Sequence, residues 1–391
     1  MRKICFITTK SITIKAFLVD FANFLVLNFG FDVTFICSFD EELFSYCSEN
    51  IHFIPVNMKR GVGFDGPVVI RRLKKIFKQQ QFDIIQYATP NAAFYASIAS
   101  RETRCKHRLY CQWGVRYMGF NHGIKRCVFK WIEKAICSNS TEIESESFSL
   151  YKFSIKEKLY PEKKASVIWN GSACGVDLDR FNIKKRKEWR IKKRKELGIP
   201  DDAFVFGYVG RLTKDKGINE LIKAFLQIQK TNGNAFLLLC GSFDNRDSIE
   251  KPLKEWLLTS SRVLFIKWTD KVEEFFSVMD VFVSLSYREG FGLVVIEAAA
   301  MGVPSIVTDC PGQKDTIEEN KDGWLVPVRN VEQVVEVMNS CLDQLDLVQS
   351  FGMEARKKVE EKYEQRQLFN QLAEHRIEIM EKDSLFDSEE S

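Results

Sequence analysis

Length, composition and charge exclude several classes of protein at the outset. The chain has 391 residues, of which 45% are hydrophobic and 28% are charged, and its 57 Lys and Arg against 53 Asp and Glu give a net charge of +4. This is ordinary globular usage at a length that suits two or three domains, so a disordered chain, a collagen and a coiled-coil rod are excluded. The charge is uneven, because residues 183–195 alone hold nine Lys or Arg and one Glu.

The first half of the chain alternates short apolar runs with longer amphipathic ones. Strands are expected at residues 4–8, 32–37, 52–55, 83–87 and 108–111, and helices at 12–29, 67–80, 91–100 and 123–136. Alternation at this spacing predicts right-handed βαβ units and a mostly parallel sheet.

The same alternation restarts after the basic segment. Strands are expected at residues 205–209, 235–240, 263–267, 281–286, 305–308 and 324–326, and helices at 218–229, 272–278, 292–300 and 331–343. The sequence therefore predicts an α/β protein of two doubly wound Rossmann-like domains, at 1–168 and 169–360. The segment 361–391 is expected to hold a helix at 361–380 that crosses back to the N-terminal domain, and then an acidic tail.

Cysteine usage and hydropathy indicate the compartment. None of the 11 cysteines is spaced CxxC and the four histidines show no ligand spacing, so we expect free thiols and no metal site. Charged residues interrupt the apolar N-terminus, and no run approaches the roughly 18 uncharged apolar residues of a membrane span. These observations favour a cytoplasmic protein with neither a signal peptide nor a transmembrane helix.

A first motif, GRLTKDKG at residues 210–217, lies between an expected strand and an expected helix. In an open α/β sheet, ligands bind beyond the carboxyl ends of the strands, where such a turn offers free backbone N–H groups and the positive end of a helix. Arg211 and Lys216 add two fixed cations, a combination that suits a diphosphate. A solvated basic turn is the alternative.

A second motif, YREGFGLVVIE at residues 287–297, follows an expected strand and opens a helix. A carboxylate facing a diphosphate would repel it, so Glu289 and Glu297 are expected to accept hydrogen bonds from hydroxyls. Glu297 would take the ribose diol of a nucleotide, and Glu289 a hydroxyl of an attached sugar. Glu289 could instead be a first-turn acid that stabilises the helix, but a second Glu on an otherwise apolar helix then has no explanation.

These residues carry a resemblance to a known family. GRLTKDKG, followed by SYREGFGLVVIEAAAMGVPSIVTD at residues 286–309, resembles the signature of glycosyltransferase family 4. NGSACGVDLDRF at 170–181 and DGWLV at 322–326 are similar to further motifs of that family, in the same order. The resemblance covers residues 165–330. It implies a retaining enzyme with the GT-B fold, in which two Rossmann-like domains face each other across a cleft.

The resemblance also implies roles for individual residues. Arg211 and Lys216 would hold the donor diphosphate and stabilise the leaving nucleoside diphosphate, and with Glu289 they form the expected catalytic set. The expected donor site contains these three residues together with Gly210, Lys267, Trp268, Gly290, Phe291, Gly292, Leu293 and Glu297. Ordinary packing is the alternative for Trp268, a candidate for nucleobase contact. No metal and no cofactor is expected, because the two cations supply the positive charge and the nucleotide sugar is a co-substrate.

The first domain resembles a bacterial branch of the family that builds cell-surface polysaccharides on lipid carriers. Where that branch usually has His before Gly after the fifth strand, this chain has Trp113 and Gly114, and where it often has His after the fourth strand, this chain has Gln86. The acceptor-side candidates are therefore Trp113, Gly114 and Gln86, and no catalytic histidine is transferred. Either Trp113 stacks on a sugar, or a neighbour such as Gln112 substitutes for the histidine, or activity is reduced.

The function that this resemblance implies is metal-independent, retaining transfer of a hexose from a nucleotide sugar, expected to be UDP-linked. The acceptor would be a hydroxyl of a saccharide, expected to be lipid-linked, in the biosynthesis of a surface polysaccharide such as a capsule or lipopolysaccharide. Two alternatives remain open: a nucleotide-sugar epimerase on the same fold, and a catalytically silent homologue that acts as a binding partner.

The basic residues allow two interpretations. Residues 183–195 form either a solvated, mainly helical arm or a contact with anionic lipid headgroups. Basic pairs in the first domain, near the apolar residues Phe64, Val68 and Phe77, could join such a contact and hold the chain at the cytosolic face of a membrane; they are Lys59 with Arg60, Arg71 with Arg72, Lys74 with Lys75, and Lys125 with Arg126. No nucleic-acid recognition module accompanies the lysines, so nucleic acid is not an expected partner.

Overall fold

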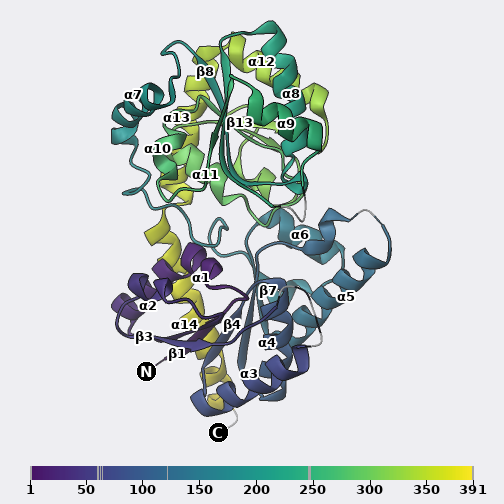
Figure 1. Ribbon diagram of the computed structural model, residues 1–391. Coiled ribbons are helices and arrows are strands. Elements are labelled where there is room, and N and C mark those ends of the chain that lie inside the picture. Colours follow the sequence, from purple (N-terminus) through teal and green to yellow (C-terminus); the bar gives the residue numbers. More distant parts are fainter. Residues whose placement is uncertain are drawn as a thin grey trace. The chain divides into compact units, whose positions relative to one another are not determined.

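The computed structural model describes residues 2–59, 61, 63, 65–120, 122–244 and 248–389. The chain divides into two compact units: unit 1 is Met1–Cys174 with Arg366–Ser391, and unit 2 is Gly175–Gln365 (Figure 1). Unit 2 is one continuous segment, and backbone hydrogen bonds of Val176 with Tyr363 and Gln365 join its two ends. Unit 1 takes a helix from the part of the chain that follows unit 2.

The described part of unit 1 holds a seven-stranded parallel sheet in the order β3-β2-β1-β4-β5-β6-β7. Its strands are β1 (Lys3–Ile7), β2 (Asp32–Cys37), β3 (Ile51–Pro55), β4 (Ile84–Tyr87), β5 (His107–Gln112), β6 (Glu142–Ser145) and β7 (Ala165–Ser166). Neighbouring side chains of β1 point to opposite faces, and Cys5, Phe6 and Ile7 are all buried. Both faces of this sheet are therefore covered, as parallel sheets require.

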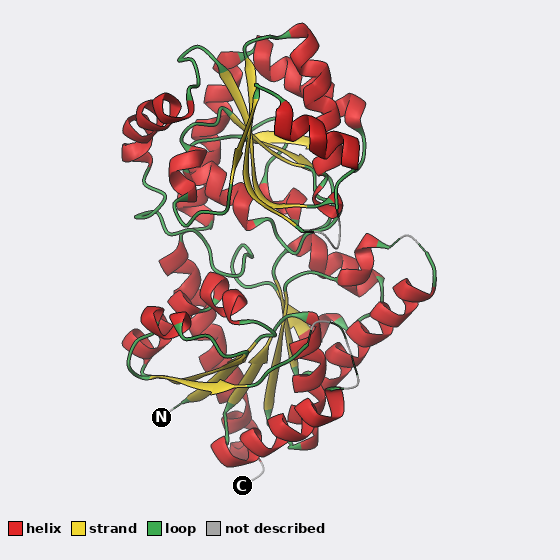
Figure 2. Ribbon diagram, viewed as in Figure 1, coloured by secondary structure: helices red, strands yellow, loops and turns green. Residues whose placement is uncertain are grey.

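Helices form the two outer layers of unit 1 (Figures 1 and 2). They are α1 (Ser11–Phe17), α2 (Val19–Phe29), α3 (Gly66–Gln80), α4 (Pro90–Glu102), α5 (Ile124–Asn139), α6 (Phe148–Lys156) and α14 (Gln365–Glu389). α4 packs between α3 and α5 over one face. On the other face Phe369 of α14 contacts Phe21 and Phe24 of α2, and Phe21 contacts Phe6 of β1.

The described part of unit 2 repeats this plan with a six-stranded parallel sheet in the order β10-β9-β8-β11-β12-β13. Its strands are β8 (Phe204–Leu212), β9 (Ala235–Phe243), β10 (Val263–Ile266), β11 (Val281–Ser284), β12 (Ser305–Thr308) and β13 (Gly323–Val326). Its helices are α7 (Arg186–Leu197), α8 (Ile218–Thr231), α9 (Lys251–Thr259), α10 (Val272–Phe276), α11 (Leu293–Ala300), α12 (Val331–Asp343) and α13 (Leu345–Lys362). One apolar cluster lies on each side of the sheet.

Two predicted helices differ from the structure. The helix expected at 12–29 is interrupted at Leu18, whose φ of −125° separates α1 from α2. The helix expected at 361–380 is two helices, because α13 ends at Lys362 and α14 begins at Gln365. The break coincides with backbone pairing to Val176, which donates to the Tyr363 carbonyl and accepts from the Gln365 N–H, while the Tyr363 N–H still donates to Val359 within α13.

The basic segment at 183–195 is mostly the helix α7, and its arginines serve unit 2 internally. Arg186, Arg190 and Arg194 recur every four residues and therefore lie on one face of the helix. Arg190 and Arg194 form ion pairs with Asp280 at 2.6 and 3.1 Å. All three arginines also donate to backbone carbonyls between Ser277 and Gly302. Arg194 donates in addition to carbonyls between Pro200 and Ala203. Much of the basic charge of α7 thus fixes the helix to its own unit.

No single helix among the described residues is both long and apolar enough to cross a bilayer, although α1 and α2 together have sufficient length and apolar composition, with a 59° bend between them. Several side chains of this pair lie in the core of unit 1, among them Ile14, Phe21 and Leu25.

Candidate active site

The two sequence motifs of unit 2 meet at one point of its sheet. β8 and β11 are hydrogen-bonded neighbours in the sheet. After β8 the chain adds strands toward one edge of the sheet, and after β11 it adds them toward the other edge. Open α/β sheets bind ligands beyond the carboxyl ends of two such strands. The loop after β8 carries Lys214–Lys216, and the loop after β11 carries Glu289. The Tyr287 N–H donates to the Asp215 carbonyl at 2.9 Å, and Arg288 pairs with the Asp215 carboxylate at 2.9 Å, so the two loops are held together.

Gly217 makes this close approach possible. Its φ of +70° lies in the left-handed region, and a Cβ atom there would stand 2.1 Å from the Leu285 carbonyl oxygen at the end of β11. A side chain at position 217 would therefore separate the two loops. The motif requires glycine here for contact within the protein, in addition to any contact with a ligand.

Lys216 and Glu289 form the centre of the site. The Lys216 ammonium donates to Oε1 of Glu289, and the Ser286 hydroxyl donates to the same oxygen at 2.7 Å. The two side chains are 21% and 17% exposed, so both reach solvent. Among the described residues Oε2 of Glu289 has no hydrogen-bond partner. A carboxylate oxygen is therefore available to accept from a ligand hydroxyl beside a fixed cation.

Arg211 lies near the end of β8, just before this loop, and its side chain is more open than that of Lys216. Its side chain is 53% exposed and approaches the Asp244 carboxylate at 3.6 Å. Its own carbonyl accepts from the buried Tyr208 hydroxyl at 2.9 Å, which fixes the backbone at the end of β8. Gly210 before it has a φ of +144°, and a Cβ atom there would stand 2.8 Å from the same Tyr208 hydroxyl.

The glycines before α11 bring a third loop to the site. Gly292 is the residue before the helix and has a φ of +111°. Gly312, after β12, packs so closely that a Cβ atom on it would stand 2.5 Å from the Gly290 carbonyl oxygen. Phe291 points the other way, since it is 3% exposed and its ring meets Tyr363 edge-on at 5.4 Å. Phe291 therefore anchors the turn, and only its backbone can serve a ligand.

Glu297 occupies the second turn of α11, and Leu293 at the start of that helix is half-buried. Burial raises the pKa of Glu297 to about 7, an effect that Arg180 opposes and Glu273 reinforces. Arg180 itself pairs with Glu273 at 3.1 Å, and among the described residues no hydrogen bond or ion pair satisfies the Glu297 carboxyl. A half-buried carboxyl without a partner is costly to retain unless a ligand completes it.

Lys267 and Trp268 follow the end of β10, two strands away from β8. Both are exposed, and Trp268 has 63% of its surface in solvent. This degree of exposure argues against ordinary packing for the Trp268 ring.

Sequence reasoning missed the loop after β12. The Gln313 side chain donates to the Ser284 carbonyl and accepts from the Ser284 hydroxyl, and the Thr308 hydroxyl donates to the Ser286 carbonyl. These bonds hold the ends of β11 and β12 beneath Glu289. The Pro-Gly pair at 311–312 signals a turn there, but nothing in the sequence indicates which strand end the turn supports.

The acceptor-side candidates of unit 1 are not gathered together. Gln86 is 3% exposed, and its amide oxygen accepts two bonds from Arg376 of α14, at 3.1 and 3.3 Å. Arg376, itself buried, also forms an ion pair with the largely buried Glu144. Gln86 therefore helps to fix α14 to the sheet.

Gln112, the other candidate for the missing histidine, is fully buried. Its NH₂ group donates to Glu133 at 2.9 Å, and its oxygen accepts from Ser154 and Tyr160 at 3.1 and 3.0 Å. Burial raises the pKa of Glu133 to about 7, although the bonds from Gln112 and Tyr110 act in the opposite direction. The polar capacity of Gln112 is thus used within the core.

Trp113 and Gly114 remain accessible at the end of β5. Trp113 is half-buried and packs against Phe17 of α1 with ring centroids 5.2 Å apart, and Gly114 has a φ of +110°. A further feature, which the sequence does not reveal, lies between the ends of β1 and β4, where the hydroxyls of Thr9 and Thr89 are 2.9 Å apart. Thr89 has a φ of +65°, a strained conformation for a β-branched residue.

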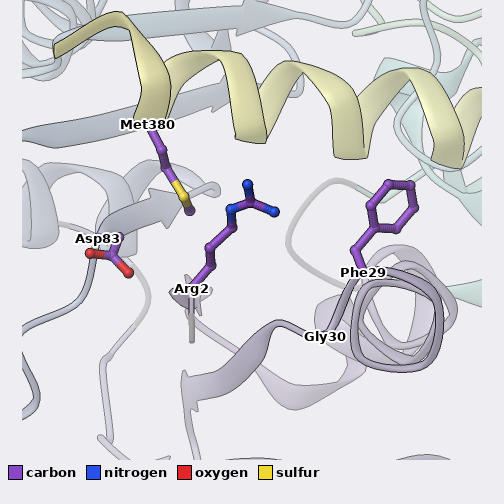
Figure 3. Close-up of a pocket in the computed structure, with 5 residues that line it drawn as sticks. All are labelled: Arg2, Phe29, Gly30, Asp83 and Met380. Atoms are coloured by element: carbon purple, nitrogen blue, oxygen red, sulfur yellow. The ribbon is translucent and has the colours of Figure 1, made fainter. Parts of the chain in front are cut away.

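One hollow of unit 1 lies at the opposite, amino end of its strands. Figure 3 shows this hollow of about 460 Å³, lined by Arg2, Phe29, Gly30, Asp83 and Met380. Asp83 accepts from the Lys3 N–H at 2.7 Å, and Arg2 pairs with Glu381 of α14 at 3.3 Å. Because these charges are paired locally and lie away from the carboxyl ends, this hollow is not the candidate active site.

Comparison with known proteins assigns both parts of the chain to glycosyltransferases. Residues 190–358 match the family model "Glycosyl transferases group 1", and residues 3–147 match "Glycosyl transferase 4-like". The capsular polysaccharide biosynthesis glycosyltransferase CapM of Staphylococcus aureus is 31% identical over 341 residues, which cover 87% of this chain and 88% of CapM. The UDP-Gal:alpha-D-GlcNAc-diphosphoundecaprenol alpha-1,3-galactosyltransferase of Escherichia coli is 24% identical over 323 residues, or 82% of each chain.

A solved structure confirms the predicted fold. HepE of Anabaena, crystallised with UDP and glucose, superimposes with a TM-score of 0.77 at 18% identity and covers 96% of this chain and 99% of HepE. Two doubly wound parallel sheets in the GT-B fold are thus shown for this chain. The protein belongs to the group 1 glycosyltransferases, and the predicted glycosyltransferase class is confirmed.

Proposed function

We propose that this protein is a retaining, metal-independent glycosyltransferase that moves a sugar from a UDP-linked donor to a hydroxyl of a lipid-linked saccharide, in the synthesis of a surface polysaccharide. The observation that carries the proposal is the junction of Lys216 and Glu289 at the carboxyl ends of β8 and β11. It combines a cation for a diphosphate with an acceptor for sugar hydroxyls in one solvent-reaching site.

The two oxygens of Glu289 have separate tasks in this proposal. Oε1 accepts from Lys216 and Ser286 and so holds the ammonium in place. Oε2 accepts from a hydroxyl of the donor sugar. Lys216 and Arg211 then face the diphosphate and stabilise the negative charge that develops when the glycosidic bond to phosphate breaks, which is the largest effect in many active sites. The Gly290, Phe291 and Gly292 backbone and the N-terminus of α11 add N–H donors.

Glu297 is assigned to the ribose diol. Its carboxyl lacks a partner among the described residues and has a pKa near 7, so an ionised form is accessible at neutral pH and is completed by two hydroxyl donors. The exposed ring of Trp268, with Lys267 beside it, is assigned to the nucleobase.

The names of relatives support the choice of donor and acceptor. HepE has been crystallised with UDP and with UDP-glucose, and the E. coli relative is named for transfer of galactose from UDP-Gal to a GlcNAc-diphosphoundecaprenol. A lipid-linked acceptor places the reaction at a membrane surface, for which we propose the cytosolic face. Retention of the anomeric configuration follows from the resemblance of the Glu289–Glu297 spacing to a retaining family, with the leaving phosphate accepting the proton of the acceptor hydroxyl.

The deciding experiment measures nucleoside diphosphate release from a panel of nucleotide sugars, with and without a GlcNAc-diphospholipid acceptor. The proposal expects release that depends on acceptor and is fastest with a UDP-sugar, unaffected by chelator, and an NMR spectrum of the product that shows retention. Conversion of the donor to an epimer without acceptor would identify an epimerase. Absence of turnover with every donor, despite donor binding, would identify a catalytically silent homologue.

A further inference from the structure

The outer face of α5 is unusually apolar for a helix at the surface. Ile124, Val128 and Trp131 recur at spacings of four and three residues, so they form one stripe along the helix, and they are 83%, 47% and 63% exposed. Cys127 lies on the same stripe and is the exposed member of the 11 cysteines. The opposite side of α5 contributes Ile132 and Ile136 to the core. The helix therefore has an apolar face on each side.

The cations of α5 separate into two groups. Arg126 and Lys130 form ion pairs with Glu157 of unit 1 at 3.3 and 2.6 Å, so their charges are neutralised within the protein. Lys125 and Lys134 are exposed, and among the described residues neither has a partner. The single acidic residue of α5, Glu133, is buried. The exposed apolar stripe is thus flanked by free positive charge without any negative charge from its own helix.

α3 presents a second basic face on the other side of α4. Arg71, Arg72 and Lys75 lie exposed with Val68 on the outer side of this helix, and none of them has a partner among the described residues. The sequence of α3 contains no Asp or Glu. α3 and α5 both contact α4 and cover the same face of the unit 1 sheet (Figure 1).

We propose that these two helices form the surface by which the protein binds an anionic membrane. Ile124, Val128 and Trp131 would enter the interface between headgroups and acyl chains, and Arg71, Arg72 and Lys75 would contact the anionic headgroups; these six residues are called the α3–α5 face. Amphipathic helices with Lys or Arg beside Trp and aliphatic residues bind membranes in this way, and each cation near an anionic surface adds affinity. The inference rests on the proposed lipid-linked acceptor.

The charge pattern favours a membrane over a second copy of this chain. A self-complementary interface would place the cations of α3 and α5 against those of its partner, because a twofold contact brings the same surface from each copy together. α3 and α5 carry no exposed acidic group to compensate, and Glu102 of α4, which packs between them, already pairs with Lys74. An anionic bilayer supplies that negative charge across the whole face.

The structure also corrects the candidate surface that the sequence indicates. Phe77 is 4% exposed and packs in the core, and Lys74 forms an ion pair with Glu102 at 2.6 Å. Arg60 and Phe64 lie outside the described residues. On α7 the arginines are engaged internally, so only lysines such as Lys187 and Lys192 face solvent, beside Ile191. α7 therefore provides a charge-matched control.

The test is flotation of the full chain with vesicles of phosphatidylcholine alone or mixed with phosphatidylglycerol. Wild type is expected to float only with the anionic vesicles, and less at high salt. Arg71→Gln with Lys75→Gln should lower the partition coefficient about 10- to 30-fold, since two surface cations are lost. Ile124→Ser with Trp131→Ser should lower it at least about tenfold. Lys187→Gln with Lys192→Gln, which removes the same charge from α7, should leave it within about twofold.

Further measurements separate the remaining outcomes. Each variant is compared with wild type by thermal unfolding, and a fluorophore attached to Cys127 is expected to shift its emission to the blue only when anionic vesicles are added. Equal flotation of all variants, or flotation that is independent of anionic lipid, would overturn the proposal. So would a wild-type dimer, detected by light scattering, that the Ile124→Ser and Trp131→Ser changes convert to a monomer.

Catalysis is followed separately from docking. With a short-chain, water-soluble acceptor, both α3–α5 variants should release nucleoside diphosphate at the wild-type rate. Anionic flotation without any sugar transfer would refute the proposed function and leave the membrane surface standing. Sugar transfer to the soluble acceptor without flotation of the wild type would refute the membrane surface and leave the proposed function standing.

Discussion

In unit 2, polar side chains that follow β11 retain unused hydrogen-bonding capacity, whereas in unit 1 the polar side chains of Gln86 and Gln112, near the ends of β4 and β5, are buried in the core. Oε2 of Glu289 and the Glu297 carboxyl have no partner among the described residues. The amide oxygens of Gln86 and Gln112, by contrast, each accept two hydrogen bonds from side chains of unit 1, that of Gln86 from Arg376 and that of Gln112 from Ser154 and Tyr160. A polar residue at the end of a parallel strand is thus a ligand candidate only if the protein leaves it unsatisfied.

The largest test of this contrast is the removal of Lys216. We expect Lys216→Ala to lower kcat/KM for the donor by about 10²- to 10³-fold, because it removes a preorganised cation from the developing phosphate charge. Arg211→Ala should fall in the same range. Lys214→Ala, two residues away on the same loop and exposed, is the matched control and should turn over normally. Near-wild-type turnover in Lys216→Ala would refute the assignment.

Glu289 should be nearly as sensitive. Glu289→Ala removes both the acceptor for the sugar and the partner that holds Lys216, so we expect a loss of the order of 10² in kcat. Glu289→Gln keeps one oxygen and should recover part of this loss. Steady-state kinetics with a saturating acceptor provide the measurement, and a change confined to KM would mean that Glu289 only binds substrate.

In unit 1 the contrast predicts an effect on stability. Burial raises the pKa of Glu133 from its ordinary 4.5 to about 7, so the folded state holds a proton that the unfolded state has released between these values. The contribution of Glu133 to the free energy of unfolding is fully present below pH 4.5. It falls by about 3 kcal/mol as the pH rises to 7. Glu133→Gln should remove this loss, and thermal unfolding of both proteins from pH 5 to 8 would show it. Parallel pH profiles would contradict the prediction.

Glu297 should affect pH dependence rather than the rate of the chemical step. Its pKa of about 7 means that raising the pH ionises the carboxyl and allows it to accept from both ribose hydroxyls. The donor KM of the wild type should therefore fall about tenfold between pH 6 and pH 8. Glu297→Gln should show little change over this range, and an unchanged pH profile would exclude Glu297 from the donor site.

Trp113 offers the smallest expected effect. If its half-buried ring stacks on an acceptor sugar, Trp113→Ala should raise the acceptor KM a few-fold, by about 1 kcal/mol, and leave the donor KM unaltered. Trp113→Phe, which keeps an aromatic ring, should restore most of the wild-type affinity for the acceptor. A change in stability alone would mean that the ring serves only to pack on Phe17.

The sequence predicts unit 2 better than unit 1 for physical reasons. Around Lys216 and Glu289 the geometry depends on local turns, which spacing and glycine positions indicate directly. In unit 1 the fate of Gln86 depends on Arg376, which is 290 residues away, and no local pattern shows such a contact. β6 escaped prediction because its sequence, EIES, is short and contains a single apolar residue. The arginines of α7 appear as surface charge until their carbonyl partners are known.

The Arg376–Glu144 contact also constrains the order in which the molecule is made. Unit 2 is encoded continuously, so it can fold while the remainder of the chain is still being synthesised. Unit 1 cannot be completed at that stage, because its largely buried Glu144 has no ion-pair partner until Arg376 leaves the ribosome, after the whole of unit 2. A buried carboxylate without its partner is strongly destabilising, so the second unit of the sequence is the first that can reach its final state during translation.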